Sequence, residues 1–223
     1  MQQPTVYDHR NVYDTGAGGG SSINISDFFN LDIKGIYHNN TNNNISPHKL
    51  IKPVNNDDFE LEGEYYIANP LLSESPGNFF TLNTSSSFNS LVYLYGQGIS
   101  NPRMVRFGNN YTSKDISYNF VANEYSLITI SPTEIKLNNT NIKITSTPGV
   151  VSLTHLWPVP TNNNNAHGNN YKISVKKISI KKISTNEYVA VFVAAIRKSD
   201  NAVGLFNYVT GGFYTDSYLS YYA

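Results

Sequence analysis

The sequence predicts a mainly β protein, in which antiparallel strands form a sandwich or barrel-like sheets behind a flexible N-terminal arm. Short runs of alternating or β-branched residues recur from Asp57 to the end of the chain, separated by Ser, Pro, Gly and Asn. No window of about eleven residues keeps a helical spacing of its apolar positions. The 223 residues are 39% hydrophobic, which suffices for one domain, or two small ones, with a real core.

Residues 1–22 are predicted to be a flexible anchoring arm. The triplet "VYD" occurs twice, and "GAGGGSS" then leaves the backbone free of any single conformation. We expect the arm to dock on a larger assembly through four residues of the two triplets, Val6, Tyr7, Val12 and Tyr13.

Residues 23–56 are predicted to be a linker or loop region. "ISDFFNL" has the composition of a single helical turn with Ser26 as its N-cap. The Asn-rich stretch "HNNTNNNISPH" that follows is typical of a polar loop.

Two β units are expected in the rest of the chain, a module over residues 57–120 and an antiparallel domain over residues 121–223. The predicted strands are "DFELEGEYYI", "NFFTL", "SLVYLYG", "RMVRF", "YSLITIS", "TEIKLNN", "NIKITS", "GVVSLTHLW", "YKISVKKISI", "EYVAVFVAAIRK", "AVGLFNYVT" and "GFYTDSYLSYY". Turns are expected at "LNNTNI", "STNE", "KSDN" and "TGG".

The lysine-rich stretch "KISVKKISIKKIS" is interpreted as a strand. Ile173 and Val175 share one phase of the alternation, whereas Ile178 and Ile180 share the other. Slips at the two Lys-Lys pairs, of the kind that β-bulges produce, account for the change of phase. The lysines are then expected on a solvated face or a sheet edge. A stripe that binds a polyanion, and a role at a membrane surface, stay open as alternatives.

Acidic residues alternate in "DDFELEGE", so a strand places Asp58, Glu60, Glu62 and Glu64 on one face. An exposed strand face is the favoured interpretation. The open alternatives are a site for a hard cation and paired carboxylates for glycoside hydrolysis.

The end of the chain is rich in tyrosine and predicts an interface. "GFYTDSYLSYY" places Tyr214, Tyr218 and Tyr222 on one strand face, which suits a subunit interface or, as an alternative, a platform for sugars. "EYVAVFVAAIR" is apolar on both faces, which predicts a central strand covered on both sides. Since the chain offers few elements to cover it, a homo-oligomer that buries residues 188–222 is expected.

Several classes of function are not expected. The formal net charge is zero, whereas general nucleic-acid binders carry a basic surplus. Cysteine is absent, and no apolar run reaches the length of a membrane span. The first residues show no charged region followed by an apolar one, so no signal peptide is expected. The histidines form no HExxH pattern, and "GAGGGSS" lacks the Lys-Ser/Thr of a phosphate-binding loop. We therefore expect no enzyme, cofactor or metal.

Residues 61–113 carry, in order, Gly63, Tyr65, Tyr66, Ile67, Asn69, Pro70, Gly77, Tyr93, Tyr95, Arg103 and Arg106. This order resembles that of the knob-type modules of phage tail fibres and pyocin fibres. The resemblance implies a phage virion appendage that is oligomeric, with a trimer favoured and a dimer as the alternative, and that has no enzymatic activity of its own.

The expected function is that of a virion structural protein, either a fibre, a collar or a capsid-decoration subunit, that contributes to host attachment. It would be made in the host cytoplasm and located in the virion, where the N-terminal arm would dock on other virion proteins. A carbohydrate-binding or receptor-binding β module is the alternative, which the tyrosines favour together with Arg103 and Arg106. Its partner would be a cell-surface glycan.

Overall fold

The computed structural model confirms a mainly β fold, with 64% of the described residues in strands and 4% in helix. The predicted arm, residues 1–22, lies outside the described residues. The structure describes residues 24–38, 54–55, 58–68, 77–84, 87–95, 104–106, 121–131, 133–143, 150–155, 173–215 and 219–223.

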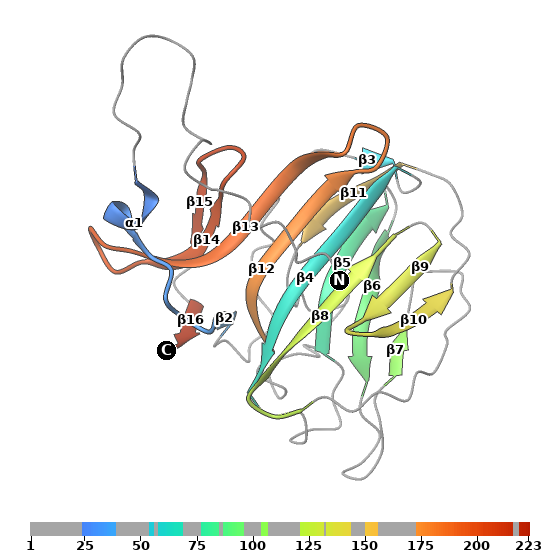
Figure 1. Cartoon of the computed structure of the whole chain (residues 1–223), viewed down its shortest axis with the longest axis horizontal. Coiled ribbons are helices and arrows are strands. Elements are labelled where there is room, and N and C mark those ends of the chain that lie inside the picture. The colour runs from blue at the N-terminus through green and yellow to red at the C-terminus, as the bar shows by residue number, and fades with distance from the viewer. Residues whose placement is uncertain are drawn as a thin grey trace.

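Most described strands join one eleven-stranded sheet, here called the large sheet (Figure 1). Its main path runs β10-β9-β8-β4-β12-β13-β14-β15, and every pairing is antiparallel. The sheet is not closed into a barrel. The strands of this path are β4 (Phe59–Ile67), β8 (Glu124–Ile130), β9 (Glu134–Leu137), β10 (Thr140–Lys143), β12 (Ile173–Lys182), β13 (Glu187–Arg197), β14 (Val203–Asn207) and β15 (Phe213–Thr215).

Three short strands extend the large sheet at one end: β1 (Phe29–Asn30), β2 (Gly35–His38) and β16 (Leu219–Tyr222). β1 pairs with β13, and β2 pairs with both β12 and β16. The segment predicted as a linker therefore contributes strands to the sheet. The helical turn expected there is α1 (Ile25–Phe28), although its N-cap is Asn24 and not Ser26.

A second sheet of five strands lies behind the large sheet in the view of Figure 1. Its strands, in spatial order, are β3 (Val54–Asn55), β11 (Val150–His155), β5 (Gly77–Thr84), β6 (Ser87–Tyr95) and β7 (Met104–Arg106). Segments before and after residue 120 pair within both sheets, because β4 lies beside β8 and β12, and β5 beside β11. The predicted boundary at that residue does not coincide with a division between the sheets.

The predicted slip at the first Lys-Lys pair is a β-bulge. Against β4, Val175 pairs with Tyr65 and Lys177 pairs with Glu64, which leaves Lys176 as the extra residue. Val175, Ile178 and Ile180 are consequently all buried. The second predicted slip is wrong for this pairing, because the β12–β4 register runs without a break from Lys177 to Lys182. The irregularity near Lys181 lies in the pairing with β13.

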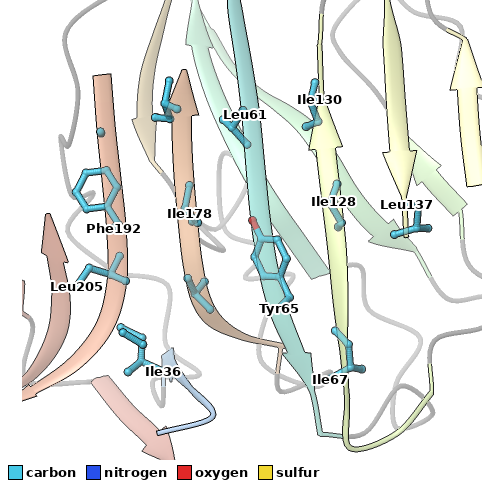
Figure 2. Packing of buried hydrophobic residues seen from close by; sticks show 14 of the residues in the cluster. Ile36, Leu61, Tyr65, Ile67, Ile128, Ile130, Leu137, Ile178, Phe192 and Leu205 are labelled. Atoms are coloured by element: carbon cyan, nitrogen blue, oxygen red, sulfur yellow. The ribbon is translucent and has the colours of Figure 1, made fainter. Parts of the chain in front are cut away.

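One hydrophobic cluster fills the inner face of the large sheet, the face that carries Leu61 and Tyr65 (Figure 2). Its labelled side chains form a continuous row from Leu137 on β9 to Leu205 on β14. Alternation in β4 explains the pattern, since its inward residues are at most 4% exposed. Burial of this many large side chains provides the main stabilisation of the fold.

β13 is a central strand that is covered on both faces, as predicted. Ala190, Phe192 and Ala194 join the inner cluster, whereas Ala195 belongs to a second cluster on the opposite face. The chain itself provides the second cover. Phe206 belongs to the same cluster as Ala195, and Phe29 packs against that cluster with its ring 4.8 Å from that of Phe206. The expectation that a second subunit must cover β13 therefore loses its basis.

Candidate functional surface

The outer face of the large sheet, opposite the inner cluster, carries the polar side chains of β4 and β12. Glu60, Glu62 and Glu64 alternate with buried residues and are half-exposed, so the prediction of a single acidic face is confirmed for these three. The strand that carries them, β4, lies between β8 and β12.

The acidic and basic stretches of the sequence lie beside each other on this face. Lys177 stands across from Glu64, and Lys181 across from Glu60. The pKa of Glu62 is raised by burial, while Lys177 and Lys181 lower it. Because β12 is a central strand, Lys177 and Lys181 do not lie on a sheet edge. The positive charge of each faces a carboxylate of β4.

Asp58 closes the turn between β12 and β13 instead of joining the glutamates. One of its carboxylate oxygens accepts a hydrogen bond from the backbone N–H of Ser184 at 2.7 Å, and the other accepts from the Ser184 hydroxyl at 2.8 Å. The Lys182 ammonium lies 3.8 Å away. These hydrogen bonds, and the Lys182 charge, lower the pKa of Asp58. In the part of the chain that the structure describes, no three Asp, Glu or His side chains gather into a possible metal site.

Four tyrosines gather where β4 ends, and we call Tyr37, Tyr66, Tyr125 and Tyr222 the tyrosine cluster. Tyr66 is the centre, with its ring centroid 5.4 Å from that of Tyr125 and 5.6 Å from that of Tyr222. Tyr37 stacks on Tyr222 at 4.6 Å. These spacings are typical of favourable aromatic pairs.

Hydrogen bonds fix the exposed side of the cluster. The Tyr66 hydroxyl donates to Oδ1 of Asn123, and the Tyr125 hydroxyl donates to the backbone carbonyl of Lys34, both at 3.1 Å. The Lys34 ammonium stands 5.8 Å from the Tyr66 ring centroid, and the Lys34 backbone N–H donates to the carbonyl of Tyr222 at 2.7 Å. The cluster is thus held by segments from both ends of the chain.

Burial sets the acidity of two cluster hydroxyls. It raises the pKa of Tyr222 to about 12, with smaller contributions from Tyr37 and Tyr66. It also raises the pKa of Tyr125, to which the charge of Glu64 contributes. Both hydroxyls therefore stay protonated at neutral pH.

The tyrosines predicted at the end of the chain do not share a strand. Tyr214 lies on β15 and makes an edge contact with Phe192 at 5.7 Å, whereas Tyr222 lies on β16 in the tyrosine cluster. The single strand predicted there is wrong, because β15 pairs with β14 and β16 pairs with β2. Tyr218 lies outside the described residues.

The remaining predicted site residues are not brought together by the described part of the chain. Arg106 ends β7 opposite Tyr93. The predicted docking residues Val6, Tyr7, Val12 and Tyr13, together with Arg103, lie outside the described residues.

Sequence reasoning missed Tyr37, Tyr66 and Tyr125 as members of one site. They come from three separate strands, so no spacing connects them. The available signal was the pair in "EYYI", where a buried Tyr65 forces its neighbour Tyr66 onto the opposite face.

Within the described ranges, no helix is long and apolar enough to cross a membrane. Comparison of the chain with protein-family models, curated proteins and solved structures finds no match.

Proposed function

We propose that the protein is a non-enzymatic structural component of a phage virion, a fibre, collar or capsid-decoration subunit that works by assembly. One observation carries the proposal. The large sheet is open, and among the described strands β10 pairs only with β9 and β15 only with β14. Open edges present backbone N–H and C=O groups to other chains, so a protein of this shape is suited to add to an assembly.

The resemblance to fibre knob modules supports the same function. Gly63, Tyr65, Tyr66 and Ile67, which open the resembling segment, all lie on β4 at the centre of the large sheet. Tyr65 and Ile67 are fully buried, and Tyr66 is the centre of the tyrosine cluster.

Deletion of residues 1–15 tests the proposed anchoring to a larger particle. In cells that produce the particles, we expect the deleted chain to fold and to be missing from purified particles. The far-ultraviolet circular dichroism of the two chains provides the control for folding. Incorporation of the deleted chain at the level of the full chain would exclude anchoring through the arm.

A carbohydrate-binding or receptor-binding β module is the second candidate function. The tyrosine cluster favours it, because Tyr125 keeps 42% of its surface exposed although its ring is held in place. Binding of glycans by a monomeric chain would support this candidate against the first. A stable oligomer without affinity for glycans would support the first.

A further inference from the structure

We propose that the exposed ring of Tyr125 stacks on the apolar face of a neutral pyranose sugar, with Lys34 and Glu64 at its rim. This inference rests on the second candidate function above, and it gives that function a site and a class of ligand. Tyr125, Leu127, Lys34 and Glu64 are called the Tyr125 platform below.

The platform offers a small apolar surface on the outer face of β8. Tyr125 and Leu127 are 42% and 39% exposed, and their alternate positions place both on the same side of the sheet. Two side chains of this size match one sugar ring. A stable protein interface needs a far larger patch, of about 800 Å² on each partner.

The ring of Tyr125 is fixed before any ligand binds. Its hydroxyl donates to the carbonyl of Lys34 at 3.1 Å, and the tilted contact with Tyr66 supports the ring from beside it. Tyr66 is in turn held by Asn123 at 3.1 Å. A fixed ring loses little conformational entropy on binding. The hydroxyl holds the ring in place, and stacking on a ligand would use the ring itself.

Charged groups of opposite sign stand on the rim of the platform. The exposed Lys34 ammonium lies 5.8 Å from the ring centroid of Tyr66, the neighbour of Tyr125. Glu64 is paired in register with Leu127, and its charge adds to the effect of burial in raising the pKa of Tyr125. An ammonium donates hydrogen bonds and a carboxylate accepts them, so together they suit the hydroxyl groups around a pyranose.

The charge balance favours a neutral sugar over a charged one. Glu60, Glu62 and Glu64 on β4 are matched by Lys177 and Lys181, which face them from β12, and by Lys34 beside the Tyr66 ring. The surface around the platform therefore has no excess of either sign that would attract an acidic or a cationic sugar. A neutral pyranose needs no such excess and uses the flat ring as well as the two polar groups.

Saturation-transfer NMR on the full chain tests the inference. The probes are the methyl glycosides of glucose, galactose and N-acetylglucosamine, at the millimolar concentrations that weak binding requires. We expect saturation to reach the C–H protons on one face of at least one of the three. Free N-acetylneuraminic acid, an acidic sugar, should receive less.

Variants assign the binding to the platform. Tyr125→Ala should weaken binding roughly tenfold or more, whereas Tyr125→Phe keeps the ring and should retain most of it. Tyr221→Ala is the matched control, because Tyr221 is a tyrosine of similar exposure, 45%, on another strand. If Tyr125→Ala does not fold by circular dichroism, Leu127→Ser replaces it and should also weaken binding.

Two results would overturn the inference: no transfer to any of the three glycosides, or equal transfer in wild type and in the folded Tyr125→Ala or Leu127→Ser variant. Neither result bears on assembly, which is measured as molecular mass without sugar. Equal transfer in wild type and variant would exclude the Tyr125 platform and leave the carbohydrate-binding function in place, so failure of this inference is distinguishable from failure of either proposed function.

Discussion

Asparagine is abundant, with 31 residues, and part of that abundance has a structural use. The non-glycine residues with positive φ in the described part of the chain are all asparagine: Asn123, Asn138, Asn186 and Asn201. Other side chains cost about 1–2 kcal/mol in this left-handed region, which asparagine tolerates. The turns predicted at "LNNTNI", "STNE" and "KSDN" hold three of the four.

Asn138 should be sensitive to substitution for two reasons. Its φ is 50°, and its Oδ1 accepts a hydrogen bond from the Leu127 N–H at 2.7 Å. We expect Asn138→Ala to lower the free energy of unfolding by about 2 kcal/mol, since strain and the lost bond add. Asn138→Gly keeps the φ and should lose about 1 kcal/mol. Urea unfolding measures both, and equal losses would contradict the role of φ.

The lowered pKa of Asp58 should make the stability of the fold depend on pH. Its folded-state pKa is lowered from 3.8, chiefly by hydrogen bonds from Ser184. A lowered pKa contributes stability above the unfolded value, and this contribution is lost as pH falls through the folded value. The difference in Tm between wild type and Asp58→Asn should be widest near neutral pH and should shrink below about pH 4. Asp200, with a pKa of about 2, titrates in the same direction and remains in the variant. A difference in Tm that does not change with pH would refute the role of the Asp58 charge.

At the scale of elements, β12 shows that a break in the alternation of apolar residues can predict the position of a β-bulge. The change of phase between Val175 and Ile178 predicted a slip, and the bulge at Lys176 is that slip. The ammonium of Lys176 donates to the carbonyls of Leu31, at 3.0 Å, and Ile33. The bulge therefore directs one lysine of the stretch to the N-terminal segment and away from bulk solvent.

Lys176 should contribute more to stability than the lysine beside it. Lys176→Met leaves the two carbonyls without their donor, which should lower the free energy of unfolding by about 1–3 kcal/mol. Lys177→Met is the matched control on the same strand and should change it by less than about 1 kcal/mol, because Lys177 interacts with the facing carboxylates of β4 across a strand pair. Urea unfolding of both variants measures the difference. Similar losses would mean that the contacts with Leu31 and Ile33 do not matter.

The sequence could predict elements with strong local signals but not their long-range pairing. Patterns in β4, β8, β12 and β13 are long enough to be recognised, and the hairpin of β9 and β10 is local. β2 is four residues long, and its place beside β12 and β16 depends on contacts from distant parts of the chain. The tyrosine cluster needs that pairing, so it could not be predicted before the fold was known.

At the scale of the whole molecule, the two ends of the described chain are joined. β2 and β16 pair over four residues, and Ile36 and Leu219 are buried in the inner cluster. Residues 24–38, the main described part of the segment predicted as a linker, thus contribute to the core. Gly35 permits the close approach of β2 to β12, because a Cβ there would lie 2.9 Å from the Cβ of Ser174.

The central claim is that the chain acts by assembly, and its molecular mass in solution tests this most directly. Size-exclusion chromatography with light scattering should give three times the chain mass of 24.9 kDa, or twice that mass if the assembly is the alternative dimer. Tyr221→Ser, which removes an exposed ring from β16, shows whether that strand lies in the interface. A stable mass of 24.9 kDa for the wild-type chain, at every concentration that remains soluble, would contradict the claim.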